Sequence, residues 1–228
     1  MRTSKADEKL SRIRSTSTPY TVCYSGVTVS VFKNVYPTSE LSELIVEGLD
    51  DRQFGIKENN FVLDYGTGTG FLAIQAALRG ANVVATDINP NAIECALSNA
   101  ARFQLNTPID IRKGDCLNTI QDHEKFDIIM AGLPFDDAEA NDYLELSMYD
   151  PEYHMRQTLF NRAIQLLNPG GRIFMSYSES IQKRVALEKT DSRYTYQVFK
   201  NRIIKGEMHF MFMIRPNCMD PSQGMAKG

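Results

Sequence analysis

Three glycines alternate with threonines directly after a short apolar segment, an arrangement that needs a sharp turn between a strand and a helix. Residues 61–71 read FVLDYGTGTGF, so Gly66, Gly68 and Gly70 follow a run typical of a buried β-strand. Glycines allow the main chain to pass close beneath a ligand, where a Cβ atom would collide. The amide groups at the start of the following helix are free to donate hydrogen bonds. We therefore expect a ligand to bind against this turn.

From residue 60 onward, the sequence alternates short β-type runs with helical patterns. We predict strands at 61–65, 82–87, 109–112, 126–131 and 172–177, and helices at about 71–80, 90–103 and 153–167. The segment NPGG at 168–171 marks the end of the last helix. This alternation predicts an α/β fold with a mostly parallel sheet, right-handed crossovers and helices on both faces. Two further β-type runs, 194–199 and 208–214, predict an antiparallel hairpin at the end of the chain.

The first 50 residues do not follow this alternation. Residues 21–34 are rich in Val, Thr, Tyr and Phe around a Ser-Gly pair and predict a β-hairpin. Residues 40–49 have the apolar spacing of a helix, with Ser39 as its N-cap. Residues 1–19 carry five basic and two acidic residues and suit a short helix. This arm is either solvated or a lid or partner-binding segment over an active site.

The spacing of the glycines excludes two common phosphate sites. The dinucleotide fingerprint G-x-G-x-x-G would need a glycine at Phe71 or Ala73, depending on where it begins. No G-K-[ST] follows, so a Walker-type site is excluded as well. Asp64 lies two residues before the first glycine, where its carboxylate would repel a pyrophosphate. It suits a cationic group instead, such as the α-ammonium of a methionine moiety.

Two further carboxylates follow the ends of predicted strands. Asp87 ends the strand at 82–87, 17 residues after Gly70, where it can accept hydrogen bonds from both hydroxyls of a ribose. It can also cap the next helix. Asp115 follows the third strand and either accepts from an adenine amino group or is an ordinary loop aspartate. With Asp64, these carboxylates fit an amino acid, a ribose and an adenine in that order.

With these features, roughly residues 35–215 resemble the class I, Rossmann-like S-adenosylmethionine-dependent methyltransferases. The resemblance implies a seven-stranded sheet with an antiparallel last strand, S-adenosyl-L-methionine as cofactor and S-adenosyl-L-homocysteine as product. The residues implied to bind the cofactor are Asp64, Gly66, Thr67, Gly68, Gly70, Asp87, Ile88, Asp115 and Cys116. We expect residues 1–50 to form an arm, hairpin and helix that cover the site, 51–217 the cofactor-binding domain, and 218–228 a flexible tail.

The segment FDIIMAGLPFDD at 126–137 resembles the N-P-P-[YF] motif of amino-group methyltransferases. In that motif the Asn side chain and the carbonyl of the first Pro hold the target nitrogen, and the aromatic ring stacks on the substrate. The aligned residues here are Gly132, Leu133, Pro134 and Phe135, so the side-chain amide is absent. The resemblance implies that the Leu133 carbonyl accepts from the target N–H, Pro134 stiffens the turn and Phe135 offers a ring face.

Acidic residues follow this motif. Asp136 and Asp137 are the nearest candidates for a general base, unless they belong to a solvated loop. Residues 136–150 carry six carboxylates, which would repel a phosphate backbone and suit a cationic or amine substrate. We therefore predict N-methylation of a small amine or a protein side chain, with nucleic acid less favoured as a partner.

A looser resemblance leaves other functions open. Residues 31–49 resemble the stretch ahead of the glycine turn in protein-glutamine and small-ribosomal-RNA methyltransferases, without the expected Thr. If the match holds, Tyr36, Pro37 and Glu40 lie against the cofactor pocket. The alternatives are an O-methyltransferase, since the Asn is absent, a relative of those glutamine or RNA enzymes, and a pseudoenzyme that binds the cofactor without turnover. A nicotinamide dehydrogenase is disfavoured by Phe71 and Asp64.

The composition limits the remaining function classes. The 228 residues are 43% hydrophobic and 23% charged with a net charge of −3, which is ordinary for one soluble domain and gives no general attraction for nucleic acid. The four cysteines and three histidines are scattered without zinc spacing, so we expect reduced thiols and no metal. No signal-like start or membrane-length apolar run is present. We expect a cytoplasmic protein; the oligomeric state is not predictable.

Overall fold

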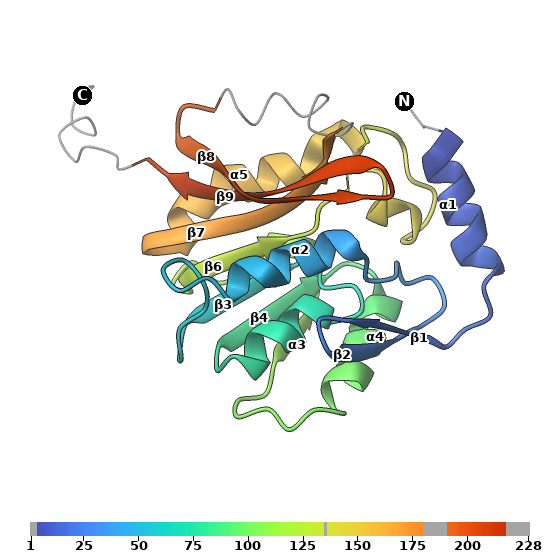
Figure 1. The fold of residues 1–228 in the computed structure, drawn as a ribbon, viewed down its shortest axis with the longest axis horizontal. Coiled ribbons are helices and arrows are strands. Elements are labelled where there is room, and N and C mark those ends of the chain that lie inside the picture. Colours follow the sequence, from blue (N-terminus) through green and yellow to red (C-terminus); the bar gives the residue numbers. More distant parts are fainter. Residues whose placement is uncertain (1–3, 135, 180–190, 218–228) are drawn as a thin grey trace.

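A seven-stranded sheet with the order β5-β4-β3-β6-β7-β9-β8 forms the centre of the computed structural model (Figure 1). The structure describes residues 4–134, 136–179 and 191–217, so the expected tail at 218–228 lies outside it. The strands are β3 (Phe61–Tyr65), β4 (Asn82–Asp87), β5 (Asp110–Lys113), β6 (Phe126–Ala131), β7 (Leu167–Ser178), β8 (Tyr194–Ile204) and β9 (Glu207–Pro216). β3 to β7 are parallel, whereas β9 pairs antiparallel with β7 and β8. The predicted mostly parallel sheet with an antiparallel terminal hairpin is confirmed.

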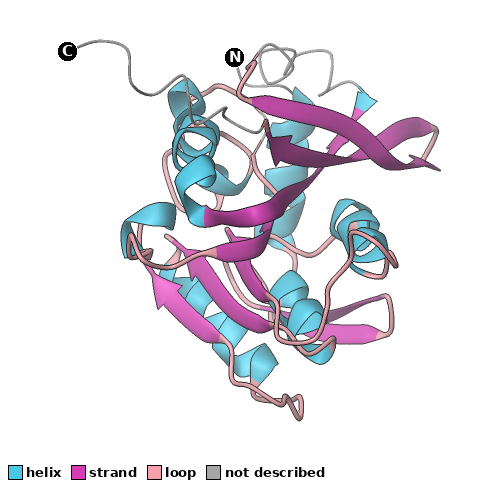
Figure 2. Ribbon diagram, turned by 90° about the vertical axis from the view of Figure 1, so that its left-hand side faces the viewer, coloured by secondary structure: helices cyan, strands magenta, loops and turns pink. Residues whose placement is uncertain are grey.

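Helices cover both faces of this sheet (Figure 2). The helices are α2 (Glu40–Leu49), α3 (Phe71–Leu78), α4 (Pro90–Ala100) and α5 (His154–Leu166), with short 3₁₀ turns η1 (Cys116–Thr119), η2 (Glu145–Ser147) and η3 (Pro151–Tyr153). Because side chains alternate along a strand, Val62 of β3 faces the core under α2 and α3, and Leu63 faces the core under α5. The apolar run of β3 is thus buried on both sides, as expected for a central parallel strand.

Several element boundaries differ from the prediction. α5 ends at Leu166 and β7 begins at Leu167, so NPGG at 168–171 lies in the first part of the strand. The register between β6 and β7 shifts there, between Phe126 and Ile128, which lets the irregular segment join the sheet. β8 and β9 are longer than predicted and meet at a turn in which Lys205 and Gly206 have φ of 51° and 83°.

The N-terminal segment forms a helix, α1 (Ser4–Ser15), and a separate hairpin of β1 (Tyr20–Tyr24) and β2 (Val27–Val31). α1 lies beside residues 136–150, which we call the acidic loop (Figure 1). Ala6 and Leu10 are buried in one cluster with Leu144, Met148 and Tyr149. The alternative of a solvated arm is therefore wrong for this helix.

The described residues contain neither a candidate membrane-spanning helix nor a candidate metal site. None of the helices there is both long and apolar enough to cross a bilayer. Nor does the described part of the chain bring three His, Cys, Asp or Glu side chains together as a metal site would need.

Candidate active site

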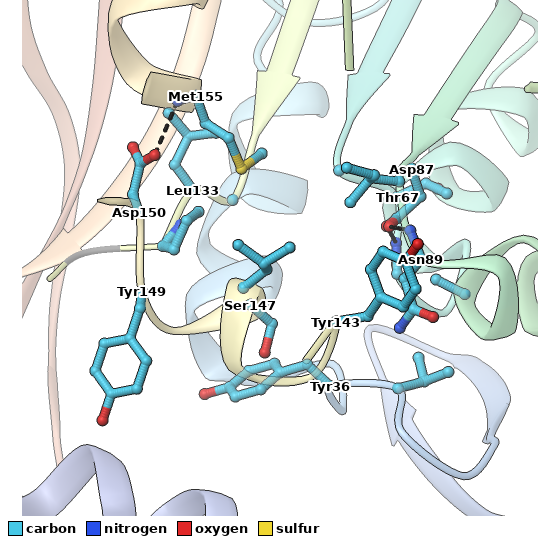
Figure 3. A pocket seen from close by; sticks show the side chains of 18 of the residues that line it. Tyr36, Thr67, Asp87, Asn89, Leu133, Tyr143, Ser147, Tyr149, Asp150 and Met155 are labelled. Atoms are coloured by element: carbon cyan, nitrogen blue, oxygen red, sulfur yellow. Dashed lines mark hydrogen bonds between the residues drawn. The ribbon is translucent and has the colours of Figure 1, made fainter. Parts of the chain in front are cut away.

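A cavity of about 480 Å³ lies at the carboxyl ends of the parallel strands, where ligands bind in open α/β sheets (Figure 3). Its walls come from several separate parts of the chain. They include the segment before α2, the glycine turn after β3, the ends of β4 and β6, the acidic loop, and the start of α5. Segments far apart in the sequence therefore meet around one space.

The glycine turn forms an open cradle on one side of this cavity. Gly66 and Gly68 have φ of 79° and 55°, values that residues with a side chain rarely adopt. A Cβ atom at Gly66 would lie 3.8 Å from Met155 Cε, and one at Gly68 would lie 4.0 Å from the Tyr36 carbonyl, so neither position is crowded by the fold. The amides of Gly66 and Thr67 donate to the Thr86 carbonyl at 3.0 and 2.9 Å, which ties the turn to β4.

Asp87 lies at the end of β4 and lines the same cavity. Its carboxylate accepts from the Gly68 amide at 2.9 Å and from the Asn89 amide at 2.9 Å. Burial raises the pKa of Asp87 above its ordinary value. Each carboxylate oxygen has a second lone pair, so Asp87 can hold the turn and still accept from a ligand.

Asp64 has a different position from the one we expected. Its side chain is only 1% exposed and does not line the cavity. One oxygen, Oδ2, accepts from Thr67 Oγ1 at 2.6 Å and from the Ala73 amide at 3.1 Å, which turns the carboxylate inward beneath the glycine turn. Burial raises the pKa of Asp64 to about 7. In this structure Asp64 holds the turn from below, and its side chain is not among those that line the cavity.

The other predicted cofactor residues fall into three groups. Thr67, Ile88 and Asp115 line the cavity, and the Asp115 carboxylate lies 3.7 Å from His154 Nε2. Gly70 does not line it; a Cβ there would come within 3.0 Å of Ala96 in α4, so this glycine permits close packing of α3 and α4. The side chain of Cys116 lies outside the described part of the structure.

The segment after β6 forms the wall opposite the glycine turn. Gly132, Leu133 and Pro134 all line the cavity, and a Cβ at Gly132 would meet nothing within 4 Å. The Pro134 carbonyl accepts from the buried guanidinium of Arg156 at 3.4 Å. Within the described residues, no hydrogen bond is made to the Leu133 carbonyl. Phe135 lies outside the described residues.

Neither candidate base reaches the cavity. Asp136 is buried and is paired through its main chain with the acidic loop: its amide donates to the Met148 carbonyl at 3.4 Å, and its carbonyl accepts from the Asp150 amide at 2.8 Å. The Asp137 carboxylate accepts from the Glu152 amide at 2.8 Å. These contacts therefore hold the beginning of the acidic loop against its end.

The acidic loop and the start of α5 supply lining residues that the sequence analysis did not single out. They include Tyr143, Ser147, Tyr149, Asp150 and Met155 (Figure 3). For the four loop residues, the only sequence signal was their position in a loop expected beside the acceptor, because an irregular segment has no periodicity that distinguishes inward from outward positions. Met155 belongs to the predicted helix at 153–167. From the looser resemblance, Tyr36 and Pro37 line the cavity, whereas Glu40 does not.

The charged groups around the cavity are mostly acidic. The lining residues include the carboxylates Asp87, Asp115, Glu139, Asp150 and Glu152, and no lysine or arginine from the described part of the chain. Of the six acidic-loop carboxylates, only Glu139 and Asp150 line the cavity. Asp142 and Glu145 form ion pairs with Arg14 of α1 instead, at 2.7 and 3.0 Å.

Comparison with known proteins relates this arrangement to a family. The model of a family described as "Methyltransferase domain" matches residues 56–214. A release factor glutamine methyltransferase of Rhodopirellula baltica is 27% identical over 176 residues, which cover 69% of this chain and 59% of that protein. A tRNA1(Val) (adenine(37)-N6)-methyltransferase of Porphyromonas gingivalis is 35% identical over 119 residues, which cover 49% of this chain and 47% of that protein.

A solved structure shows the same fold. The T. thermophilus 16S rRNA N2 G1207 methyltransferase, in complex with AdoMet and guanosine, has a TM-score of 0.65 at 19% sequence identity. The match covers 88% of this chain and 50% of that one. The chain likewise spans only about half the length of the curated relatives it matches.

Proposed function

Since this chain belongs to the methyltransferase-domain family, whose class I fold serves S-adenosylmethionine-dependent methyl transfer, we propose that it methylates a nitrogen atom of a small amine or a protein side chain. The observation that carries this proposal is that the glycine turn, Asp87 and Leu133 all line one cavity. The cofactor supplies a methyl group already activated on a sulfonium. The protein's task is then to hold the two reactants in line and near contact.

The residues of the glycine turn fit this cofactor. Gly66 and Gly68 line the cavity without a Cβ atom, so the cradle suits a ligand that lies close to the main chain. The Asp87 carboxylate suits the two hydroxyls of a ribose, because its second lone pairs remain available. Asp115, which also lines the cavity, suits an exocyclic amino group. Asp64 supports the turn from below through Thr67 and Ala73.

The wall formed by Leu133 and Pro134 suits an acceptor that carries an N–H. The Leu133 carbonyl can accept a hydrogen bond and so orient the nitrogen lone pair toward the methyl donor. Arg156 fixes the next carbonyl, that of Pro134, which keeps this short segment in place.

The charges favour an amine over a phosphate-bearing acceptor. Glu139, Asp150 and Glu152 lie on the acceptor side, and no lysine or arginine from the described residues lines the cavity. Carboxylates attract a cationic group and repel a phosphate backbone. The tRNA-methylating relative nevertheless makes RNA the second acceptor class to test.

Methyl labelling separates these outcomes. The purified protein is incubated with methyl-labelled S-adenosylmethionine and a cell extract that was treated with nuclease, with protease, or passed through a size filter. We expect label in the protein or small-molecule fraction and methylated nitrogen on product analysis, with Asp87→Ala as the inactive control. Label that disappears with nuclease, or label on oxygen, would contradict the proposed acceptor. Cofactor binding without any transfer would indicate a pseudoenzyme.

A further inference from the structure

Tyr143 is the one aromatic side chain of the acidic loop that the fold leaves half exposed, at 44%. It lines the same cavity as Asp87 and Asn89. In Figure 3 its side chain points from the loop toward the end of the cavity where Thr67, Asp87 and Asn89 lie. The side chain therefore faces the region of the glycine turn, although it belongs to the loop on the acceptor side.

Packing within the acidic loop does not explain the position of the Tyr143 side chain. The neighbouring Tyr149 is fully buried, and its hydroxyl donates to Asp7 of α1 at 2.7 Å. Tyr143, by contrast, makes no hydrogen bond or ring contact with any residue that the structure describes. A large, partly apolar side chain without a partner at the edge of a ligand cavity is a candidate ligand contact.

The main chain on both sides of Tyr143 is held in place. Asp142 and Glu145 pair with Arg14. The Glu145 carboxylate also accepts from the Asn141 amide at 2.9 Å, and the Glu145 amide donates to Asp142 at 2.9 Å. Leu144 is buried against α1. The ring is therefore presented from an anchored segment, which lowers the entropy lost when it contacts a ligand.

We propose that Tyr143 binds the adenosine part of the cofactor and so closes the acidic loop over the cofactor site. This rests on the proposed function, because it takes S-adenosylmethionine as the ligand of the glycine turn. An aromatic ring can pack on the face of a nucleobase or ribose, a contact that does not depend on hydrogen-bond geometry. The loop that lines the acceptor side would then also contribute to cofactor affinity.

The absence of tryptophan in this chain gives a direct test. In Tyr143→Trp the only tryptophan reports on the cavity, and we expect its emission to change on titration with S-adenosylhomocysteine. The matched control is Phe61→Trp, which places the only tryptophan at a 53% exposed position at the start of β3, outside the cavity lining and at the opposite end of the strand from the glycine turn. Its emission should stay constant. A Tyr143→Trp signal that does not respond, while calorimetry shows binding, would overturn the proposal.

Affinity measurements give a second, independent test. We expect Tyr143→Ala to weaken binding of S-adenosylhomocysteine by about tenfold, and Tyr143→Phe to stay within about twofold of the unchanged protein, because stacking needs only the ring. Unchanged melting temperatures would show that both variants fold. If Tyr143→Ala bound S-adenosylhomocysteine with full affinity and only its KM for the acceptor rose, Tyr143 would belong to the acceptor site. That result would overturn the inference about Tyr143 and leave the proposed function standing. If the unchanged protein did not bind the compound, the proposed function would fail as well.

Discussion

The Asp87 side chain both stabilises the glycine turn and lines the cavity. It holds Gly68 and Asn89 through their amides and also lines the cavity. We expect Asp87→Ala to weaken binding of S-adenosylhomocysteine by about 1–3 kcal/mol, since charge-assisted hydrogen bonds are lost and the cradle loosens. Isothermal titration calorimetry measures this. Asp122→Ala, at a fully exposed aspartate, is the control and should bind normally. Unchanged affinity in Asp87→Ala would mean that the ligand lies elsewhere.

Asp64 makes the stability of the fold depend on pH. Burial raises the pKa of Asp64 to about 7 in the folded state from its ordinary value of 3.8, so the folded protein binds more protons than the unfolded chain between these two values. Stability contributed by protonated Asp64 is therefore present below about pH 4 and is lost as the pH rises to about 7. Each pKa unit corresponds to about 1.4 kcal/mol.

Asp64→Asn should reduce the loss of folding stability that occurs as the pH rises. The amide oxygen can still accept from Thr67 and Ala73, whose hydrogen bonds both go to one oxygen of Asp64, but the group no longer ionises. Urea denaturation at several pH values between 4 and 7.5 measures the free energy of unfolding of each variant. We expect the gap between Asp64→Asn and the unchanged protein to widen in favour of the variant as the pH rises. Parallel curves would show that Asp64 ionises normally, and Asp122→Asn should leave the curve unchanged.

At the scale of elements, Gly70 sets how closely α3 and α4 approach. It has φ of 79°, and an added Cβ would lie 3.0 Å from both Cα and Cβ of Ala96. We expect Gly70→Ala to lower the free energy of unfolding by about 3 kcal/mol, from backbone strain and overpacking together. Gly206→Ala isolates the strain alone, because Gly206 has φ of 83° and open space around it; it should cost about 1 kcal/mol. Equal losses in urea denaturation would contradict this account.

Regular apolar strands could be predicted from the sequence, whereas irregular segments could not. The strands at 61–65, 82–87 and 126–131 agree with β3, β4 and β6, because apolar runs between turn residues specify buried parallel strands. The start of β7 could not be predicted, since Pro and Gly at 168–171 indicate a loop and only pairing with β6 brings them into the sheet. The acidic loop has no regular pattern, and its contact between Tyr149 and Asp7 joins residues far apart in the chain.

For the whole molecule, topology decides how much of the candidate site the sequence could predict. The glycine turn, Asp87 and Leu133 follow three strands that are parallel neighbours, so their meeting at one edge of the sheet could be expected. Side-chain direction could not. Asp64 points inward because Thr67 and Ala73 bind it, and Asp136 is buried outside the cavity lining, where its main chain pairs with Met148 and Asp150. Such hydrogen bonds depend on three-dimensional placement that spacing does not encode.

The distribution of charge over the molecule predicts weak binding to RNA. The net charge is −3, and the basic residues of α1 are partly engaged, with Arg14 paired to the acidic loop and Lys9 lying over the Tyr36 ring at 4.7 Å. We therefore expect filter binding to bulk tRNA at 0.1 M salt to show a Kd no tighter than about 10⁻⁴ M, the weak limit of non-specific binding. The tRNA-methylating relative makes tRNA the relevant probe.

Charge reversal tests whether the carboxylates that line the cavity cause this weak binding to tRNA. Glu139→Lys with Glu152→Lys changes two lining carboxylates to cations, and we expect it to create tRNA binding that falls steeply with salt. Glu58→Lys with Asp122→Lys changes the net charge equally at exposed positions outside the cavity lining, and it should bind tRNA far less. Equal binding by the two double variants would assign the effect to net charge alone. Tight, salt-sensitive tRNA binding by the unchanged protein would instead move the acceptor from amines to nucleic acid, because the acidic rim would then not exclude a phosphate backbone.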